Sequence, residues 1–234
     1  MNAPASGSFA ALEALAAQAR CVGLALRGAF HARAREFEPL LGAVPAGTVV
    51  LLGFTGSEQW PHFAASAEAC DGLAHPLDRW SRRVIDALAR EHSALAVYPG
   101  DTPVAPFQQW AMRCESVSPS PLGLLIHPQY GLWHAYRGAL VLPQVLALPP
   151  VLPVASPCAS CRERPCLNAC PVEAFGTGGF RLERCVAHLT REKGGRCLGH
   201  GCLARQACPA GATYRYVPAQ MRFHMQAFHR AVAR

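Results

Sequence analysis

Eight of the eleven cysteines lie within 51 residues, from Cys158 to Cys208, and this clustering constrains the fold more than any other feature of the sequence. The N-terminal segment has no basic start and contains Glu13, so it does not have the pattern of a secretory signal. In a reducing compartment, clustered thiols are metal ligands more often than they are disulfides. The sequence therefore predicts a cytoplasmic protein with a metal-binding module.

The eight clustered cysteines form two runs of four, and each run ends in a Cys-Pro pair. Two sets of four thiolates suit either two zinc ions or two iron–sulfur clusters. Structural zinc prefers paired C-x2-C motifs, of which this region has one, whereas the terminal Cys-Pro is typical of bacterial ferredoxins. We therefore expect two [4Fe–4S] clusters, with zinc as the alternative. The expected ligands are Cys158, Cys161, Cys166, Cys170, Cys185, Cys197, Cys202 and Cys208.

The partition of these ligands is less certain than their identity, because the spacings are looser than in ferredoxins. In ferredoxins the last cysteine of one run ligates the other cluster. A crossed arrangement would place Cys208 with the first three cysteines, and Cys170 with Cys185, Cys197 and Cys202. The scattered Cys21, Cys70 and Cys114 lie in helical or apolar surroundings and are expected to be small buried hydrophobes.

Positive charge is concentrated in the same part of the chain. Residues 156–234 carry eleven Arg and one Lys against four Glu, a net charge of +8, although the whole chain has only +7. Such a module ordinarily suggests nucleic acid. Two oxidised clusters with their thiolates would contribute about −4, however, so the positive charge is explained in part as counter-charge. A nucleic-acid partner is therefore set aside as unlikely at this stage.

The rest of the chain reads as a mixed domain followed by a linker. Hydrophobic periodicity predicts helices and strands in alternation. The uncharged stretch 138–161 is long enough to span a membrane, but its five prolines exclude a lipid-exposed helix. We expect a domain at 1–142, a proline-rich linker at 143–157 and the cysteine module at 158–234, with no membrane span. Helices are predicted at 8–36, 78–91 and 219–233, and strands at 48–54, 94–98, 122–127 and 139–142.

The segment from Leu122 to Gly138 closely resembles the I-H-P-x-[FY]-G-x-W-x-x-x-R-G stretch of the CblC-type cobalamin-processing proteins. This resemblance implies a nitroreductase-like cobalamin-binding domain of the α+β class. The matching residues would then belong to a cobalamin pocket: His127, Tyr130, Gly131, Trp133 and Arg137. The aromatic residues have an alternative role in the core, and Gly131 is also explained as a turn residue that permits close backbone approach.

The cysteine module instead resembles that of epoxyqueuosine reductase and the reductive dehalogenases, in which a related cobalamin-binding domain is joined to a ferredoxin-like module with two [4Fe–4S] clusters. Asp101 lies near the position where the epoxyqueuosine reductases keep a proton-donating aspartate. The chain lacks D-x-H-x-x-G, so no histidine is evidently placed to ligate cobalt. The resemblance therefore implies base-off binding of cobalamin.

Together these features lead us to expect an oxidoreductase of the decyanating cyanocobalamin reductase type. It would remove the upper ligand of cobalamin with electrons that reach two clusters from an external low-potential donor, such as flavodoxin, ferredoxin or a flavin reductase. Two alternatives remain open. One is a tRNA-modifying enzyme like epoxyqueuosine reductase, and the other is a ferredoxin-type electron carrier or cobalamin chaperone.

Overall fold

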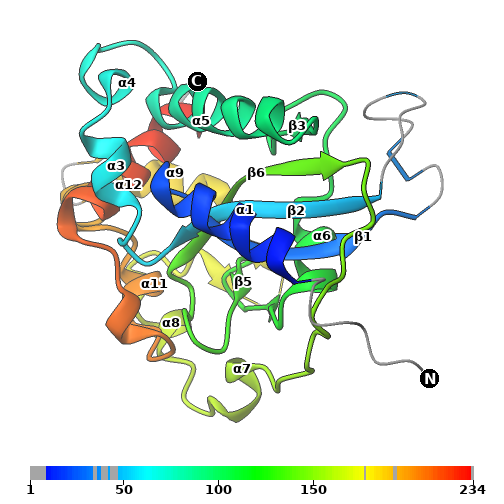
Figure 1. Ribbon diagram of the computed structural model, residues 1–234. Helices are drawn as coiled ribbons and strands as arrows, with labels where there is room; N and C mark the ends of the chain where they lie inside the picture. The colour runs from blue at the N-terminus through cyan, green and yellow to red at the C-terminus, as the bar shows by residue number, and fades with distance from the viewer. Residues whose placement is uncertain are drawn as a thin grey trace. The chain divides into compact units, whose positions relative to one another are not determined.

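The computed structural model describes residues 9–33, 36–37, 42, 47–176, 178–191 and 194–232 (Figure 1). Its contacts divide the chain into two compact units. The first unit comprises Met1–Glu115 and Ala135–Leu152, and the second comprises Ser116–His134 and Pro153–Arg234. None of the helices that the structure describes combines the length and the apolar character that crossing a membrane requires.

The first unit is built on a four-stranded sheet with the strand order β1-β2-β6-β3. All eight residues of β2 are buried, as expected for an inner strand that is covered on both faces. The pairing of β1 with β2 is antiparallel, and so is that of β3 with β6. The bounds are Ala25–His31 for β1, Thr48–Thr55 for β2, Leu95–Val97 for β3 and His134–Leu142 for β6.

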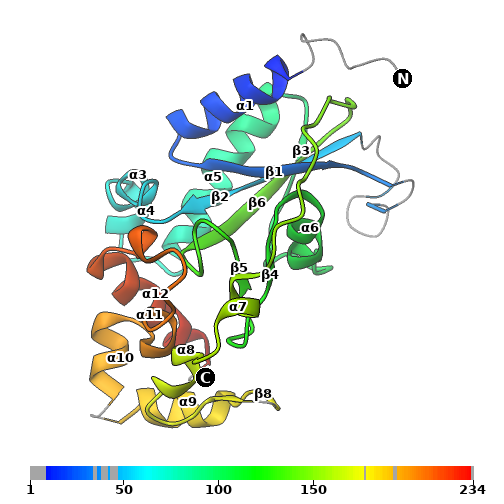
Figure 2. The ribbon, with the colours of Figure 1, turned by 90° about the horizontal axis from the view of Figure 1, so that it is seen from below.

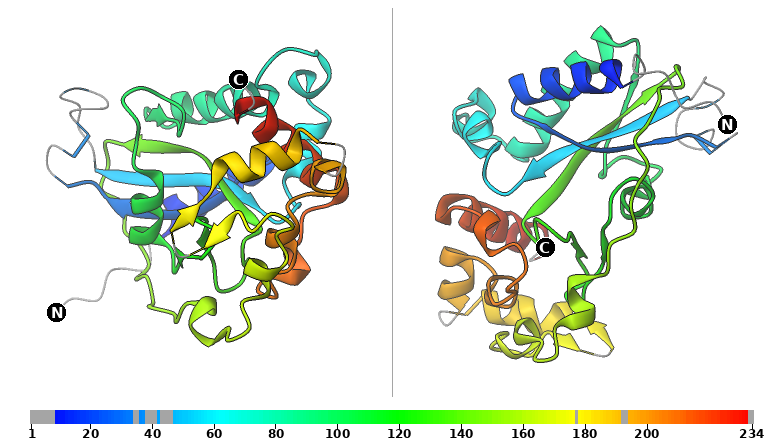
Figure 3. Two further views of the ribbon diagram at one scale, coloured as in Figure 1. Left: turned by 180° about the vertical axis from the view of Figure 1, so that it is seen from behind. Right: turned by 60° about the horizontal axis from the view of Figure 1, so that its bottom comes forward.

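Helices cover both faces of this sheet. In Figures 2 and 3, α1 (Ala10–Cys21) and α5 (Pro76–Glu91) lie on one face and α6 (Phe107–Cys114) lies on the other. Helix α5 begins with a proline, which is tolerated in the first turn, and its buried Trp80, Val84 and Leu88 recur at helical spacing. Two short helices, α3 (Trp60–Ala64) and α4 (Ala67–Cys70), precede α5.

The predicted helix at 8–36 is wrong beyond its first part. Helix α1 ends at Cys21, and Gly23 follows with φ of +83°, a left-handed conformation that stops a helix. The amide of Leu24 donates to the Ala19 carbonyl at 2.8 Å, which satisfies one of the last helical acceptors. The chain then enters β1, because pairing with the buried β2 outweighs the helical preference of its residues.

The second unit consists mostly of short helices joined by the cysteine-bearing loops. Helices α9, α10 and α12 pack on one another, and α8 packs on α11. Two small hairpins, β4–β5 and β7–β8, complete the unit (Figure 3). The helices are α7 (Pro157–Ser160), α8 (Pro165–Asn168), α9 (Leu182–Leu189), α10 (Gly195–His200), α11 (Leu203–Gln206) and α12 (Pro218–Val232). The hairpin strands are β4 (Ser118–Pro119), β5 (Leu125–Ile126), β7 (Phe175–Gly176) and β8 (Gly179–Phe180).

The two units do not follow the single boundary at 142 that the sequence suggested. Residues 116–134 belong with the cysteine-bearing unit, and 135–152 return to the first unit. The physical reason is apolar packing: Leu122, Ile126 and Leu132 share one buried cluster with Cys166 and Cys208. No helix or strand is described between Leu142 and Pro157, where the proline-rich linker was predicted.

Candidate metal centre

The first set of thiols surrounds one narrow cavity. Its lining includes Cys158, Cys161 and Cys166 from the first run together with Cys208 from the second. Prolines restrict the backbone next to three of these cysteines. Pro157 and Pro165 begin α7 and α8 and directly precede Cys158 and Cys166, and Pro209 follows Cys208. At the start of α7 the Ser156 hydroxyl caps the helix by accepting from the Cys158 amide at 3.3 Å. This grouping matches the crossed partition.

The second set contains the remaining four cysteines. Cys185 lies on α9 and Cys197 on α10, while Cys202 caps α11 and Cys170 follows α8. Burial, together with the neighbouring thiols of Cys202, Cys170 and Cys197, raises the pKa of Cys185 to about 11. Cys202 and Cys170 also raise the pKa of Cys197, and Cys170 raises that of Cys202. The four sulfur atoms therefore lie near one another.

The donor chemistry of both sets fits a [4Fe–4S] cluster. Within the described ranges, no three His, Cys, Asp or Glu side chains are arranged to hold a single metal ion. Each set instead offers four thiols, which is the complement that a cubane of four irons requires. The assignment of the eight ligands stays a prediction, and this geometry is its structural support.

Arginines supply positive charge beside both sets. Burial is the main cause that raises the pKa of Cys158, Cys197 and Cys202. The guanidinium groups of Arg164, Arg196 and Arg205, respectively, act in the opposite direction on these three thiols and favour the thiolate. Part of the positive charge of this region thus lies beside the cysteines, where it stabilises their thiolate forms.

The segment that resembled the CblC-type motif packs on the first set. Pro121 and Ile126 line the cavity together with the cysteines. The backbone at Gly131 passes so close to the turn after Cys208 that an added Cβ would lie 1.9 Å from the Ala210 carbonyl oxygen. Gly131 has φ of +55°, so the expected role in close backbone approach is confirmed.

Four of the five predicted pocket residues lie together in the second unit. The ring Nδ1 of His127 accepts from the backbone amides of Gln129 and Tyr130, at 3.0 and 3.1 Å, and thereby closes its own turn. The ring of His127 stacks on Tyr130 at 4.5 Å, and Tyr130 meets Tyr214 edge-on at 4.8 Å. Trp133 is buried and packs edge-on against Tyr216 at 5.3 Å.

Arg137, the fifth predicted residue, belongs to the first unit. Its guanidinium pairs with Asp78, and its Nε donates to the Ser81 hydroxyl at 3.0 Å. Asp101 is likewise engaged, in an ion pair with Arg82. The cobalamin pocket stays a prediction; Trp133 has the core role that was its alternative.

Sequence reasoning missed Arg205, which secures the 127–133 segment. Its guanidinium donates to the Leu132 carbonyl and lies over the rings of Trp133 and Tyr216, at 4.8 and 4.6 Å. An arginine three residues after Cys202, within a basic module, gave no signal that separated it from its neighbours.

The three scattered cysteines do not share one environment. Cys114 is buried, as expected, and burial raises the pKa of its thiol to about 12. Cys21 and Cys70 are exposed, which corrects the expectation that they are core residues. Both lie at the last position of a helix, Cys21 in α1 and Cys70 in α4.

No protein-family model matches the chain, and no curated protein matches it in sequence. Solved structures do resemble it. A crystal structure of selenomethionine-labelled epoxyqueuosine reductase is 16% identical with a TM-score of 0.52, over 92% of this chain and 69% of that one. Epoxyqueuosine reductase in complex with a tRNA-Tyr stem loop gives 17% and 0.51, over 90% and 68%. The enzyme from Streptococcus thermophilus gives 16% and 0.51, over 87% and 66%. The chain therefore shares the fold of these reductases across both units.

Proposed function

We propose that this chain is an iron–sulfur reductase of the epoxyqueuosine reductase type, with a modified RNA nucleoside as its substrate. The observation that carries the proposal is the presence of two four-thiol sets, in crossed order, within a fold similar to that of these reductases. This was an alternative in the sequence analysis, and the structural likeness now favours it over decyanation of cobalamin.

The chain's own residues hold the proposed cofactors and shield them. The cysteines would bind two [4Fe–4S] clusters, which supply transfer of single electrons. Leu122, Ile126 and Leu132 form an apolar cluster with Cys166 and Cys208, which limits the access of water to the first set. Arg205 fixes the loop that carries these apolar residues by donating to the Leu132 carbonyl. Arg164 and Arg196 add positive charge beside the thiolates.

Charge supports RNA as the partner, although nucleic acid was set aside on sequence grounds. The net charge of +8 at residues 156–234 would fall only to about +4 with two clusters of about −2 each. A residual positive charge of this size still attracts phosphate backbones. One of the similar structures is itself a complex with a tRNA stem loop.

The direct test uses anaerobically reconstituted protein, a low-potential reductant and tRNA that contains epoxyqueuosine. We expect the epoxyqueuosine to be converted to queuosine, which mass spectrometry of the digested tRNA would detect. Iron analysis of the same protein should give about eight irons per chain. A matched Cys208→Ser preparation should lose both conversion and part of its iron. Unchanged epoxyqueuosine with fully loaded protein, both with and without added cobalamin, would remove this substrate from the proposal.

Cobalamin remains the second candidate, as cofactor or as substrate. The specific observation that favours it is an aromatic cluster in which His127 and Tyr130, from the segment that resembles the cobalamin-processing proteins, meet Tyr214. Titration of the anaerobic holoprotein with cobalamin should produce the spectrum of the base-off form. Reduced protein with cyanocobalamin would then yield Co(II) cobalamin if decyanation takes place. An unchanged optical spectrum in both titrations would exclude this candidate.

A further inference from the structure

The imidazole of His188 lies beside one of the predicted cluster ligands. Its Nε2 is 3.7 Å from the Sγ of Cys197, a distance that a hydrogen bond to the large sulfur atom allows. His188 is on α9 and Cys197 is on α10, so the contact joins two helices that also pack on each other. Cys197 is only 6% exposed and His188 is half-buried. The pair is therefore partly shielded from water, where a hydrogen bond is stronger than at an exposed position.

The backbone places His188 on the face of α9 that carries a ligand. Cys185, another member of the second set, lies three residues earlier on the same helix, and side chains at this spacing share a helix face. The end of α9 is also close to the start of α10. A Cβ added at Gly194 would lie 2.2 Å from the His188 carbonyl oxygen, and the Gly194 amide donates to the Arg191 carbonyl at 2.8 Å. The helix face and this close approach both place the ring beside the second set.

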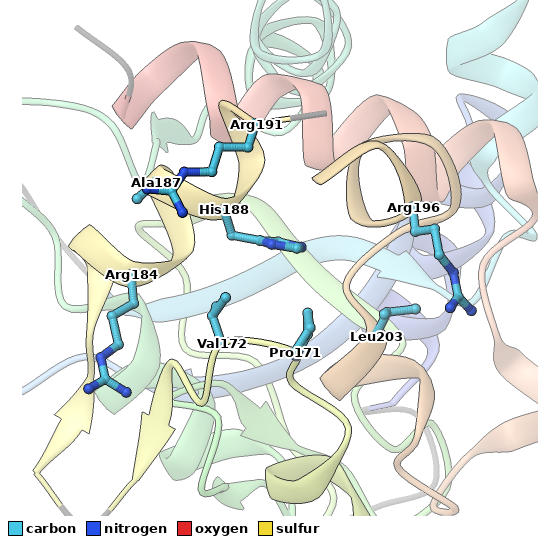
Figure 4. Close-up of a pocket in the computed structure, with 8 residues that line it drawn as sticks. All are labelled: Pro171, Val172, Arg184, Ala187, His188, Arg191, Arg196 and Leu203. Carbon is cyan, nitrogen blue, oxygen red and sulfur yellow. The ribbon is translucent and has the colours of Figure 1, made fainter. Parts of the chain in front are cut away.

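Figure 4 shows the His188 ring extending away from α9, toward the side of the view where Arg196 and Leu203 lie. Arg196 directly precedes Cys197, and Leu203 directly follows Cys202, so the ring extends toward the part of the chain that carries two of the ligands. The same ring lines a pocket of about 640 Å³. A smaller side chain at this position therefore meets open space and is not forced against its neighbours.

The chemistry of the sulfur atom decides which partner donates the hydrogen bond. A cysteine that binds a metal is a thiolate, which carries no proton and can only accept. The imidazole must then donate through its Nε2–H. Both the neutral ring with its proton on Nε2 and the protonated ring possess this donor. The direction of the bond thus follows from ligation and requires no change of protonation at His188.

We propose that His188 is a hydrogen-bond donor that sets the reduction potential of the cluster in the second set, through the thiolate of Cys197. Hydrogen bonds to the sulfur atoms are among the factors that set the potentials of iron–sulfur clusters. Reduction adds negative charge, so a donor to sulfur stabilises the reduced form more than the oxidised form. The bond should therefore raise the potential. The inference rests on the clusters of the proposed function, but it does not depend on which substrate they reduce.

The test compares the midpoint potentials of wild-type and variant protein, each full-length and reconstituted with clusters under anaerobic conditions. A redox titration followed by electron paramagnetic resonance reports the reduction of both clusters without any enzyme turnover. His188→Leu removes the donor. We expect the ratio of reduced to oxidised second cluster, at a fixed potential, to fall by about fivefold, the size that loss of one hydrogen bond gives. The first cluster should keep its midpoint potential.

Two further variants separate the hydrogen bond from the mere presence of the ring. His188→Gln keeps an N–H donor of similar reach and should restore most of the ratio. His200→Leu removes an exposed histidine at the end of α10 and should leave both midpoint potentials unchanged. Iron content and circular dichroism are measured on every variant, so that a change in fold is seen separately from a change in potential.

The shifted cluster is identified in a background that lacks the first cluster, made with Cys158→Ser and Cys166→Ser. Adding His188→Leu there should lower the ratio of the remaining cluster by the same factor. An unchanged midpoint potential in His188→Leu, an equal shift in His200→Leu, or no recovery in His188→Gln would overturn the inference. Loss of about four irons in both His188 variants would also overturn it, because the ring would then be a ligand. These results would leave the proposed reductase standing, whereas a wild-type protein without iron would overturn both.

Discussion

At the scale of single residues, the first unit contains a buried ion pair between strand β1 and the residue that follows α6. Arg27 Nε lies 2.9 Å from Glu115 Oε1, and the two side chains are 1% and 7% exposed. A second Arg27 nitrogen donates to the Phe54 carbonyl at 2.6 Å, and the Tyr136 hydroxyl donates to Glu115. Burial raises the pKa of Glu115, while Arg27 and Tyr136 hold it down. Such a pair stabilises the fold only while both partners are present.

Replacing Arg27 by methionine should therefore be costly. Arg27→Met leaves the Glu115 carboxylate buried without its cation, and we expect the free energy of unfolding at neutral pH to fall by about 3–5 kcal/mol. Urea titration followed by circular dichroism measures it. A raised folded-state pKa means that stability is gained as the pH falls, because the protonated carboxyl is neutral. The loss should therefore shrink as the pH falls toward the ordinary glutamate pKa of about 4.3, and the double variant with Glu115→Met should recover most of it. A loss that does not depend on pH would contradict this account.

At the scale of elements, the backbone at Gly131, in the turn of residues 127–131, passes close to the backbone at Ala210, and a substitution can test whether this close approach is required. Gly131→Ala places a Cβ at 1.9 Å from the Ala210 carbonyl oxygen, in addition to the strain of φ +55°. Gly123→Ala is the matched control, since Gly123 has φ of +73° but nothing within 4 Å of the added atom. We expect the control to lose only about 1–2 kcal/mol from backbone strain. Gly131→Ala should in addition lose iron from the first set, measured as iron per chain. Equal effects of the two variants would show that the close approach is unimportant.

Paired substitutions test which cysteines bind the same cluster. Cys170 and Cys197 come from different runs but lie in the same set, so Cys170→Ser with Cys197→Ser should remove one cluster and leave about four irons. Cys166→Ser with Cys197→Ser touches both sets and should remove nearly all iron. Iron analysis together with electron paramagnetic resonance of the reduced protein distinguishes the two. If the first pair abolishes both clusters, the ligands are partitioned run by run and not crossed.

Elements with strong local patterns were predictable from the sequence, and those that depend on distant partners were not. Helix α5 and strand β2 were found because their apolar residues recur at the period of the element or form one continuous run. Strand β1 was missed because its sequence, ALRGAFH, has no strand-like alternation and acquires its pairing from β2. The crossed grouping of the cysteines was predicted from the ligation pattern of ferredoxins, and it stays a prediction. The packing of residues 116–134 in the second unit could not be predicted from the sequence, because it depends on contacts with side chains up to 86 residues away, at Cys208.

At the scale of the whole molecule, charge links cofactor content to binding of nucleic acid. Residues 156–234 carry +8 without clusters and about +4 with two of them. We therefore expect the cluster-free protein to bind an unmodified RNA more tightly than the loaded protein does at low salt. The logarithm of its affinity should also fall more steeply with the logarithm of salt concentration. Fluorescence anisotropy over a series of salt concentrations measures both. Identical slopes would show that the clusters are not part of the electrostatic balance, and Arg90→Gln serves as a control for loss of one distant charge.

The crossed partition of the cysteines would also set an order of maturation during synthesis. The second set has all four thiols once Cys202 has left the ribosome, whereas the first set must wait for Cys208 although its other three cysteines precede the second set in the chain. The second cluster is therefore expected to be assembled first, inside the stretch of chain that the first cluster closes.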